Sequence, residues 1–152
     1  MTIEVGDQAP DFELRDQHGT PVKLSGDRGK KIVLIFYPLA FTGVCGNELD
    51  AIRDELIADM PEDVKILTVS VDSTFAHRAW ADQKGYTFSL LSDFWPHGQV
   101  ARAYGVFDNE KGCAERGTFI IDGEGVVRWR VVNPISRARD IAEYRKALAD
   151  LP

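Results

Sequence analysis

Residues 32–36 read IVLIF, an uninterrupted apolar run that is rich in β-branched side chains. Such a run is typical of a central strand covered on both faces, because neither face needs polar side chains. A second β-branched-rich run, VKILTVSV, occupies residues 64–71. Between the two runs, Leu49, Ile52 and Leu56 recur at spacings of three and four, which predicts a helix of about four turns. We therefore expect a strand–helix–strand unit with parallel strands.

Two hairpins are expected outside this unit. Near the N-terminus, residues 12–14 and 22–24 flank the turn-prone residues 16–19. Near the C-terminus, the apolar runs 117–121 and 126–131 flank the loop DGEG. Because hairpins contribute antiparallel strands, the sheet should be mixed.

Three further helices are predicted. The first has Ser73 as its N-cap and Gly85 as its stop, the second begins near Pro96 and stops at Gly105, and the third is amphipathic and closes the chain. Their buried faces are assigned to Ala76, Ala79, Trp80, Val100, Tyr104, Ile141, Tyr144 and Leu148. The fold class is α/β, with a central mixed sheet flanked by helices.

Composition indicates one globular domain over residues 1–152, with 44% hydrophobic and 28% charged residues. The net charge of -6 argues against a nucleic-acid partner, because phosphates would be repelled. The longest apolar run, 32–41, contains Pro38 and is about half the ~20 residues that span a bilayer. The N-terminus lacks the basic and apolar regions of a signal peptide. We expect no membrane association and a cytoplasmic location.

The chain contains two cysteines, Cys45 and Cys113. This number supports neither a disulfide framework nor a zinc ligand set. The histidines, His18, His77 and His97, are too scattered to indicate a metal site, so we expect no metal or other cofactor. The reactivity of the thiols is then the feature to explain.

Cys45 lies where the buried strand ends and the next helix begins. The unpaired N–H groups and partial positive charge of a helix start favour the thiolate, which is the nucleophilic form. Thr42 can direct its hydroxyl toward the sulfur or toward an oxygen bound beside it, and Pro38 can form a rigid apolar wall. Taken singly, such a threonine is as readily a helix cap and such a proline a strand stop.

Together these residues form Pro-x-x-x-Thr-x-x-Cys, which resembles the active-site motif of the peroxiredoxin family. The resemblance covers roughly residues 3–132 and includes, in order, VGDQAPDFEL (5–14), LSD (91–93), YGV (104–106) and RGTFIID (116–122). The segments PLAFTG (38–43) and LSDFWPHG (91–98) resemble the AhpE-type subgroup of actinobacteria, which is generally a one-cysteine enzyme.

The resemblance implies a thioredoxin-like fold with an N-terminal β-hairpin extension. It also implies reduction of hydrogen peroxide, organic hydroperoxides and peroxynitrite, and assembly as a homodimer or larger ring. A family-like dimer contact is expected around residues 38–42 and 75–80.

The resemblance assigns roles to several residues. Cys45 attacks the nearer peroxide oxygen and becomes a sulfenic acid. Arg116 lies over the thiolate and the peroxide oxygens, where it stabilises negative charge. Glu48 orients this arginine, although an acid in the first helical turn is also favoured by the helix dipole alone. The backbone N–H groups of Val44 and Cys45 face the peroxide.

Cys113 bears on how the sulfenic acid is reduced, since an internal thiol would form a disulfide. AhpE-type chains usually carry an apolar residue here. If residues 112–118 form a regular strand, Arg116 faces the site with Gly112 and Ala114, whereas Cys113 points to the opposite face. We therefore expect a buried Cys113 and an external reductant, such as mycothiol with mycoredoxin, or a glutaredoxin- or thioredoxin-like protein.

Three alternatives stay open. An atypical two-cysteine peroxiredoxin would use Cys113 as the resolving cysteine. A thiol–disulfide oxidoreductase shares the fold but normally needs Cys-x-x-Cys, whereas Cys45 is followed by GNE. A thioredoxin-fold binding or holdase module with a structural cysteine would leave the motif and Arg116 unexplained.

Overall fold

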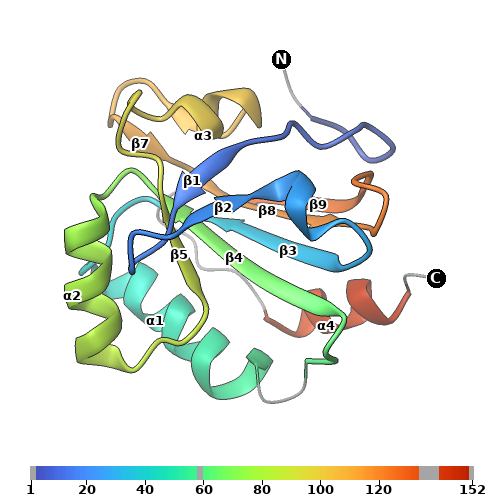
Figure 1. Cartoon of the computed structure of the whole chain (residues 1–152), viewed down its shortest axis with the longest axis horizontal. Coiled ribbons are helices and arrows are strands. Elements are labelled where there is room, and N and C mark those ends of the chain that lie inside the picture. Colours follow the sequence, from blue (N-terminus) through green and yellow to red (C-terminus); the bar gives the residue numbers. More distant parts are fainter. Residues whose placement is uncertain (1–2, 58–59, 134–140, 151–152) are drawn as a thin grey trace.

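A seven-stranded mixed sheet, in the order β2-β1-β5-β4-β3-β8-β9, runs through the middle of the molecule (Figure 1). The structure, a computed structural model, describes residues 3–57, 60–133 and 141–150. The elements in chain order are β1 (Glu13–Arg15), β2 (Pro21–Lys23), the 3₁₀ turn η1 (Leu24–Asp27), β3 (Lys31–Phe36), α1 (Gly43–Ala51), the π-helical segment η2 (Ile52–Leu56), β4 (Val64–Ser70), α2 (Thr74–Lys84), β5 (Ser89–Ser92), α3 (Gln99–Ala103), β6 (Phe107–Asp108), β7 (Cys113–Ala114), β8 (Arg116–Ile121), β9 (Val127–Asn133) and α4 (Ile141–Ala149).

The central strand β3 is the one that the apolar run predicts. It pairs in parallel with β4 and antiparallel with β8, so Leu34 lies between Leu67 and Phe119. Its residues from Ile32 to Phe36 are all buried, which explains why no polar side chain interrupts the run. The strand–helix–strand unit, both expected hairpins and the mixed sheet are confirmed.

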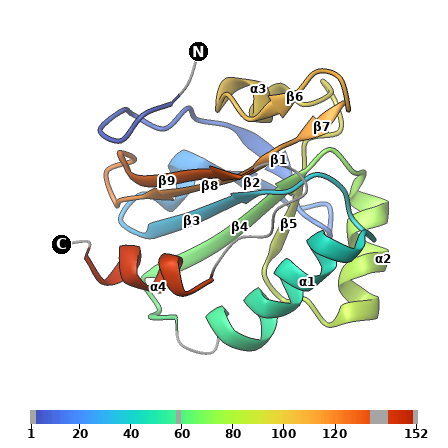
Figure 2. The same cartoon turned by 180° about the vertical axis from the view of Figure 1, so that it is seen from behind.

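Alternate side chains of β3 enter two different cores. Leu34 and Phe36 join the core beneath α3, whereas Val33, Ile35 and the following Tyr37 join the core that also contains Cys45. Figure 2 shows α1, α2 and α4 on one side of the sheet, with α3 and the β6–β7 hairpin on the other. Cys113, which lies in β7, is therefore on the opposite side of the sheet from the helices α1, α2 and α4.

Helix α2 begins and ends as predicted but turns a different face inward. The Ser73 hydroxyl accepts a hydrogen bond from the Ala76 N–H, and Gly85 ends the helix in the left-handed conformation. The assignment of Ala79 to the buried face is wrong, because Ala79 is exposed and His77 is buried beside Trp80. A pattern of apolar residues cannot reveal a buried histidine, because the imidazole counts as polar.

The other helices differ from the expectation mainly in extent. The predicted four-turn helix is α1 continued by η2, with Leu49, Ile52 and Leu56 all buried. Helix α3 starts at Gln99 rather than near Pro96, because the Asp93 carboxylate accepts hydrogen bonds from the Val100 and Ala101 N–H groups and so caps the helix later.

The closing helix is α4, where Tyr144 and Leu148 are buried as expected. The side chain of Ile141 lies outside the described residues. None of the helices in the described part of the chain is long and apolar enough to cross a membrane.

The condition of a regular strand over 112–118 is not met. Cys113 and Ala114 pair with β6 in a separate two-stranded hairpin, and Glu115 divides this hairpin from β8. Ala114 packs in the core of the opposite face rather than toward the active site. The alternation of side chains therefore cannot be carried from Arg116 back to Cys113.

Candidate active site

Cys45 occupies the first turn of α1, behind the loop 37–42 that follows β3. Its side chain is 0% exposed. Thr42 precedes the helix in an extended conformation, and the Gly46 N–H donates to the Thr42 carbonyl at 2.7 Å as the first intrahelical bond. The N–H groups of Gly43, Val44 and Cys45 precede that bond and have no acceptor within the helix. The sulfur therefore lies at the positive end of a helix, as predicted.

Arg116 contacts Cys45 directly. Its Nη1 donates to the Cys45 Sγ at 3.3 Å and to the Glu48 Oε1 at 2.5 Å. All three side chains are buried, so the cation and the carboxylate compensate each other where water does not. Cys45 of the motif and Arg116 of the Arg-Gly-Thr-Phe segment thus meet on the face of the sheet that α1 covers.

Strand alternation explains how β8 delivers this arginine. Thr118 hydrogen-bonds the Tyr144 hydroxyl and Ile120 packs beside Cys45's neighbours, so this set of alternate side chains faces the layer of α1, α2 and α4. Arg116 lies two residues before Thr118 and shares its face. Glu48 follows Cys45 by one helical turn and therefore lies on the same side of α1.

Thr42 and Pro38 bound the site from the loop. The Thr42 hydroxyl donates to the Leu39 carbonyl at 2.8 Å, so its proton does not point to the sulfur, and its oxygen accepts no capping hydrogen bond from a helix N–H. Of the two directions expected of this hydroxyl, the structure does not show the one toward the sulfur, and the one toward an oxygen bound beside the sulfur stays a prediction. Pro38 is buried, as a wall would be, while Val44 is partly exposed at the helix start.

Comparisons with known proteins identify the family. Residues 5–130 match the AhpC/TSA family. The chain belongs to the AhpC/TSA family of peroxiredoxins. It is 48% identical over 150 residues to alkyl hydroperoxide reductase E of Mycobacterium tuberculosis, covering 98% of both chains, which confirms the resemblance to the AhpE-type subgroup.

Solved structures confirm the thioredoxin-like peroxiredoxin fold. The crystal structure of Enterococcus faecalis AhpC superposes with a TM-score of 0.86 at 31% identity, covering 98% of this chain and 92% of that one. A reduced 2-Cys peroxiredoxin of Plasmodium vivax gives 0.84 at 32% identity, covering 95% of this chain and 80% of that one. This peroxiredoxin is accordingly an oxidoreductase, a thiol-dependent peroxidase.

The active-site loop of the peroxiredoxin contains a strained residue. Phe41 has a φ of 65°, the one positive φ of a non-glycine residue in the described chain. A bulky side chain in this left-handed region costs on the order of 1–3 kcal/mol and persists only where neighbouring contacts hold it. The Phe41 ring packs on Trp80 with a centroid distance of 5.8 Å.

A cluster of polar side chains beside the loop was not predicted from the sequence. Tyr37 and His77 are fully buried, and the tyrosine hydroxyl lies 3.2 Å from the His77 Nε2. The Ser70 hydroxyl lies 2.6 Å from the same nitrogen and donates to the Asp72 carboxylate at 2.6 Å. The only signal for this group in the sequence is a set of polar residues around the end of one strand and the start of a helix, which solvent-facing residues would match equally well.

Cys113 is buried and is not joined to Cys45. Burial raises the pKa of its thiol and Asp108 adds to the rise, while Lys111 partly opposes it. A raised pKa leaves less thiolate, which is the form that attacks a sulfenic acid or a disulfide.

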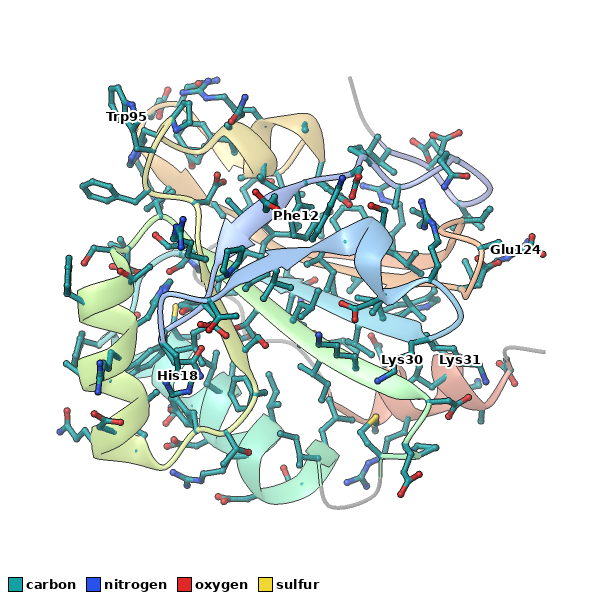
Figure 3. The ribbon with its side chains drawn as sticks, viewed as in Figure 1. Phe12, His18, Lys30, Lys31, Trp95 and Glu124 are labelled. Atoms are coloured by element: carbon teal, nitrogen blue, oxygen red, sulfur yellow. The ribbon has the colours of Figure 1, made fainter. Side chains whose placement is uncertain are left out.

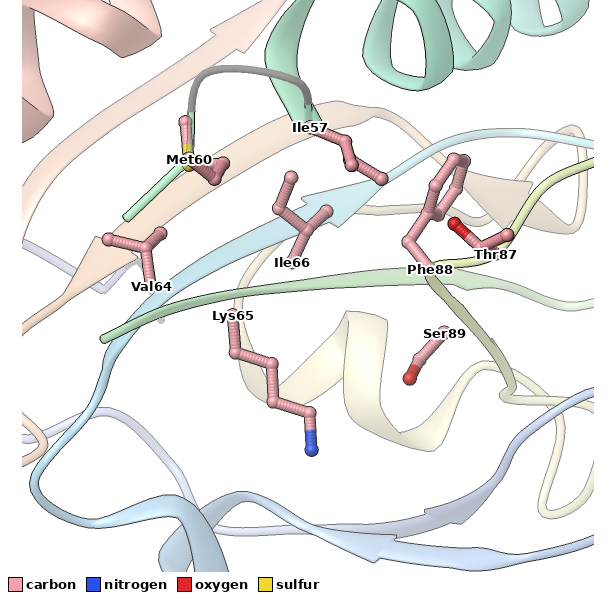
Figure 4. A pocket seen from close by; sticks show the side chains of 8 residues that line it. All are labelled: Ile57, Met60, Val64, Lys65, Ile66, Thr87, Phe88 and Ser89. Atoms are coloured by element: carbon pink, nitrogen blue, oxygen red, sulfur yellow. The ribbon is translucent and has the colours of Figure 1, made fainter. Parts of the chain in front are cut away.

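Two cavities lie near the helices but differ in their relation to Cys45. A cavity of about 260 Å³ adjoins the start of α1, with Phe41, Thr42 and Trp80 among its lining residues. Another, of about 280 Å³, lies between Ile57, Ile66 and Phe88 and includes none of the motif residues (Figure 4).

Within the described ranges, no group of three His, Cys, Asp or Glu side chains could hold a metal ion.

The buried His77 should make stability depend on pH. Burial lowers its pKa to about 4, although Asp72 opposes this shift, whereas an unfolded histidine titrates near pH 6.5. Between these values the unfolded chain binds more protons, so the free energy of unfolding should fall as the pH decreases from about 6.5 to about 4. The full effect of this one group is about 3 kcal/mol.

Urea unfolding of wild type and His77→Gln at several pH values measures the effect. The wild type should lose about 3 kcal/mol more than the variant between pH 7 and pH 4. His18→Gln, at an exposed position in the N-terminal turn (Figure 3), controls for the loss of an imidazole. Parallel curves for wild type and His77→Gln would contradict the prediction.

Proposed function

We propose that Cys45 is the peroxidatic nucleophile. The observation that carries the proposal is the guanidinium of Arg116, 3.3 Å from a sulfur at the start of a helix. The thiolate attacks one peroxide oxygen, the O–O bond breaks, and the departing oxygen takes up a proton to leave as water or an alcohol. The sulfur loses two electrons and becomes a sulfenic acid.

The neighbouring groups support this reaction in distinct ways. Arg116 stabilises the negative charge that spreads along the breaking O–O bond, and Glu48 holds the arginine in place. The N–H groups of Val44 and Cys45 and the oxygen of Thr42 bind the peroxide oxygens, while Pro38 excludes water. We propose hydrogen peroxide, organic hydroperoxides and peroxynitrite as substrates. The name of the mycobacterial relative, alkyl hydroperoxide reductase E, supports an organic hydroperoxide among them.

We propose a one-cysteine cycle with an external reductant. A first external thiol displaces water from the sulfenic acid to form a mixed disulfide, and a second thiol releases Cys45 and forms the external disulfide. The burial of Cys113 and the raised pKa of its thiol support this cycle over internal resolution. The reductant is mycothiol with mycoredoxin or another glutaredoxin- or thioredoxin-like protein, and the enzyme acts in the cytoplasm.

We also propose that the enzyme is a homodimer. Phe75, Phe94 and Trp95 are exposed and line one hollow of about 530 Å³ together with Glu13 and Arg15. The side chain of Trp95 points outward from the body (Figure 3). In a two-fold interface the same patch of each copy packs against the other copy. An apolar patch that contains both an acidic side chain, Glu13, and a basic one, Arg15, is suited to such an interface, because opposite charges of the two copies can pair.

The cysteine substitutions should separate the two thiols. Cys45→Ser should abolish peroxide consumption, whereas Cys113→Ser should retain it within about two-fold, since a buried thiol on another hairpin contributes no bond to the cycle. Mass spectrometry after one equivalent of peroxide should show one added oxygen on Cys45. A Cys45–Cys113 disulfide would overturn the one-cysteine cycle, and equal rates for wild type and Cys45→Ser would favour a binding module.

Replacing Arg116 by lysine tests the guanidinium. The lysine keeps the charge but loses the planar guanidinium, whose Nη1 donates to both Cys45 and Glu48, so the rate constant for oxidation by hydrogen peroxide should fall about 100-fold. Stopped-flow fluorescence of the buried Trp80 follows the reaction. Arg128→Lys, at an ion pair remote from the sulfur, is the matched control and should leave the rate unchanged.

The dimer proposal predicts a change of mass in solution. Wild type should sediment at twice the chain mass, and Trp95→Glu should sediment as a monomer, because each copy would bury an unpaired carboxylate in the apolar interface. Val5→Glu places the same charge on another exposed apolar position and should stay dimeric. A monomeric wild type, or a dimeric Trp95→Glu, would refute this interface.

A further inference from the structure

The middle of the active-site loop is tied to the connection between β4 and α2. The Ala40 N–H donates to the Asp72 Oδ2 at 2.8 Å. Ala40 is buried and the Asp72 side chain is only 17% exposed, so water competes weakly for this bond. Asp72 thus reaches the loop from outside the motif that contains Cys45.

The strained Phe41 explains why the loop needs an anchor. It lies between Ala40, which Asp72 holds, and Thr42, which precedes the first turn of α1. The Phe41 ring itself is half exposed, and its contact with Trp80 covers only part of it. A left-handed residue relaxes unless the chain on both sides is fixed. The bond to Ala40 supplies this restraint on the N-terminal side.

The carboxylate of Asp72 is itself held in place. It accepts a hydrogen bond from the Ser70 hydroxyl, so in the short contact between Ser70 and the His77 Nε2 the imidazole is the donor. His77 also contacts the hydroxyl of Tyr37, the first residue of the loop. One chain of polar contacts therefore connects the beginning of the loop to its middle.

This polar group has the residue types of a hydrolase triad but not its arrangement. Asp72 bonds to Ser70 rather than to the imidazole. Ser70 and His77 are both buried, so a substrate cannot reach the hydroxyl. The arrangement is suited to holding the backbone rather than to nucleophilic attack.

We propose that Asp72 is a positioning residue of the peroxidase reaction, acting through the Ala40 N–H on the turn at Phe41. This turn sets the place of Thr42 relative to the peroxide. The inference rests on the proposed role of Cys45. Arg116 reaches the sulfur from β8, independently of this loop, so Asp72 governs peroxide alignment and leaves thiolate formation to Arg116 and the helix.

The test compares oxidation of Cys45 with its alkylation in Asp72→Ala, Asp72→Asn and wild type. Oxidation by hydrogen peroxide is followed by stopped-flow fluorescence, and the pH profile of iodoacetamide alkylation reports thiolate formation. Asp72→Ala should slow oxidation about 10- to 100-fold, because small misalignments of reacting groups have effects of this size. Its alkylation profile should match wild type, and amide exchange at Ala40 should accelerate.

Asp72→Asn keeps one acceptor oxygen for the Ala40 N–H and should recover most of the rate. Should Asp72→Ala not fold, Asp72→Ser replaces it, because a seryl hydroxyl is too short to reach Ala40. Asp82→Ala, an exposed position on α2, is the matched control and should react as wild type.

The proposal would be overturned if Asp72→Ala, or Asp72→Ser in its place, were oxidised at the wild-type rate. It would also be overturned if the pH profile of alkylation in that variant differed from the wild-type profile. Equal peroxide oxidation in wild type and Cys45→Ser would instead overturn the role of Cys45, so the two failures are distinguishable.

Discussion

The burial of a guanidinium beside a sulfur atom is the constraint on which the rest of the site depends. A buried cation is tolerated only where opposite charge or hydrogen-bond acceptors surround it, and in α1 Glu48 supplies the charge while the Cys45 sulfur accepts a hydrogen bond. Arg116 can reach them only because β8 lies beside β3, whose continuation leads into the same helix. The antiparallel pairing at the centre of the sheet is therefore part of the chemistry as well as of the fold.

The loop between β3 and α1 shows how the peroxiredoxin combines a precise helix start with a short connection. The chain turns through the left-handed Phe41 and is held by contacts on both sides of the loop, namely Trp80 on α2 and Asp72 after β4. The strain is local, whereas the contacts that compensate it come from segments distant in sequence. Functional geometry of this kind is stored in the packing of the whole helical layer.

Much of this architecture could be predicted from the sequence, because periodicity reports which side chains avoid water. The run at 32–36, the hairpins and the caps at Ser73 and Gly85 were all predictable in this way. The motif and Arg116 could be found through family resemblance, although their contact depends on sheet order. Periodicity failed at His77, which is buried through hydrogen bonds rather than apolarity, and at Cys113, where a break at Glu115 interrupts the alternation. The hydrogen-bond partner of the Thr42 hydroxyl could not be predicted, because its contact with the Leu39 carbonyl depends on the exact path of the loop.

The complete burial of Cys45 has a consequence for the lifetime of the oxidised enzyme. A peroxide is small enough to enter a narrow approach, whereas a protein thiol needs the sulfur to be presented at the surface. In the proposed cycle the sulfenic acid therefore persists until an external thiol reaches it, in a site that is still suited to a second peroxide molecule. That second reaction yields a sulfinic acid, which external thiols do not reduce. The burial that makes the first oxidation selective thus also limits the peroxide concentration at which the enzyme can turn over without being inactivated.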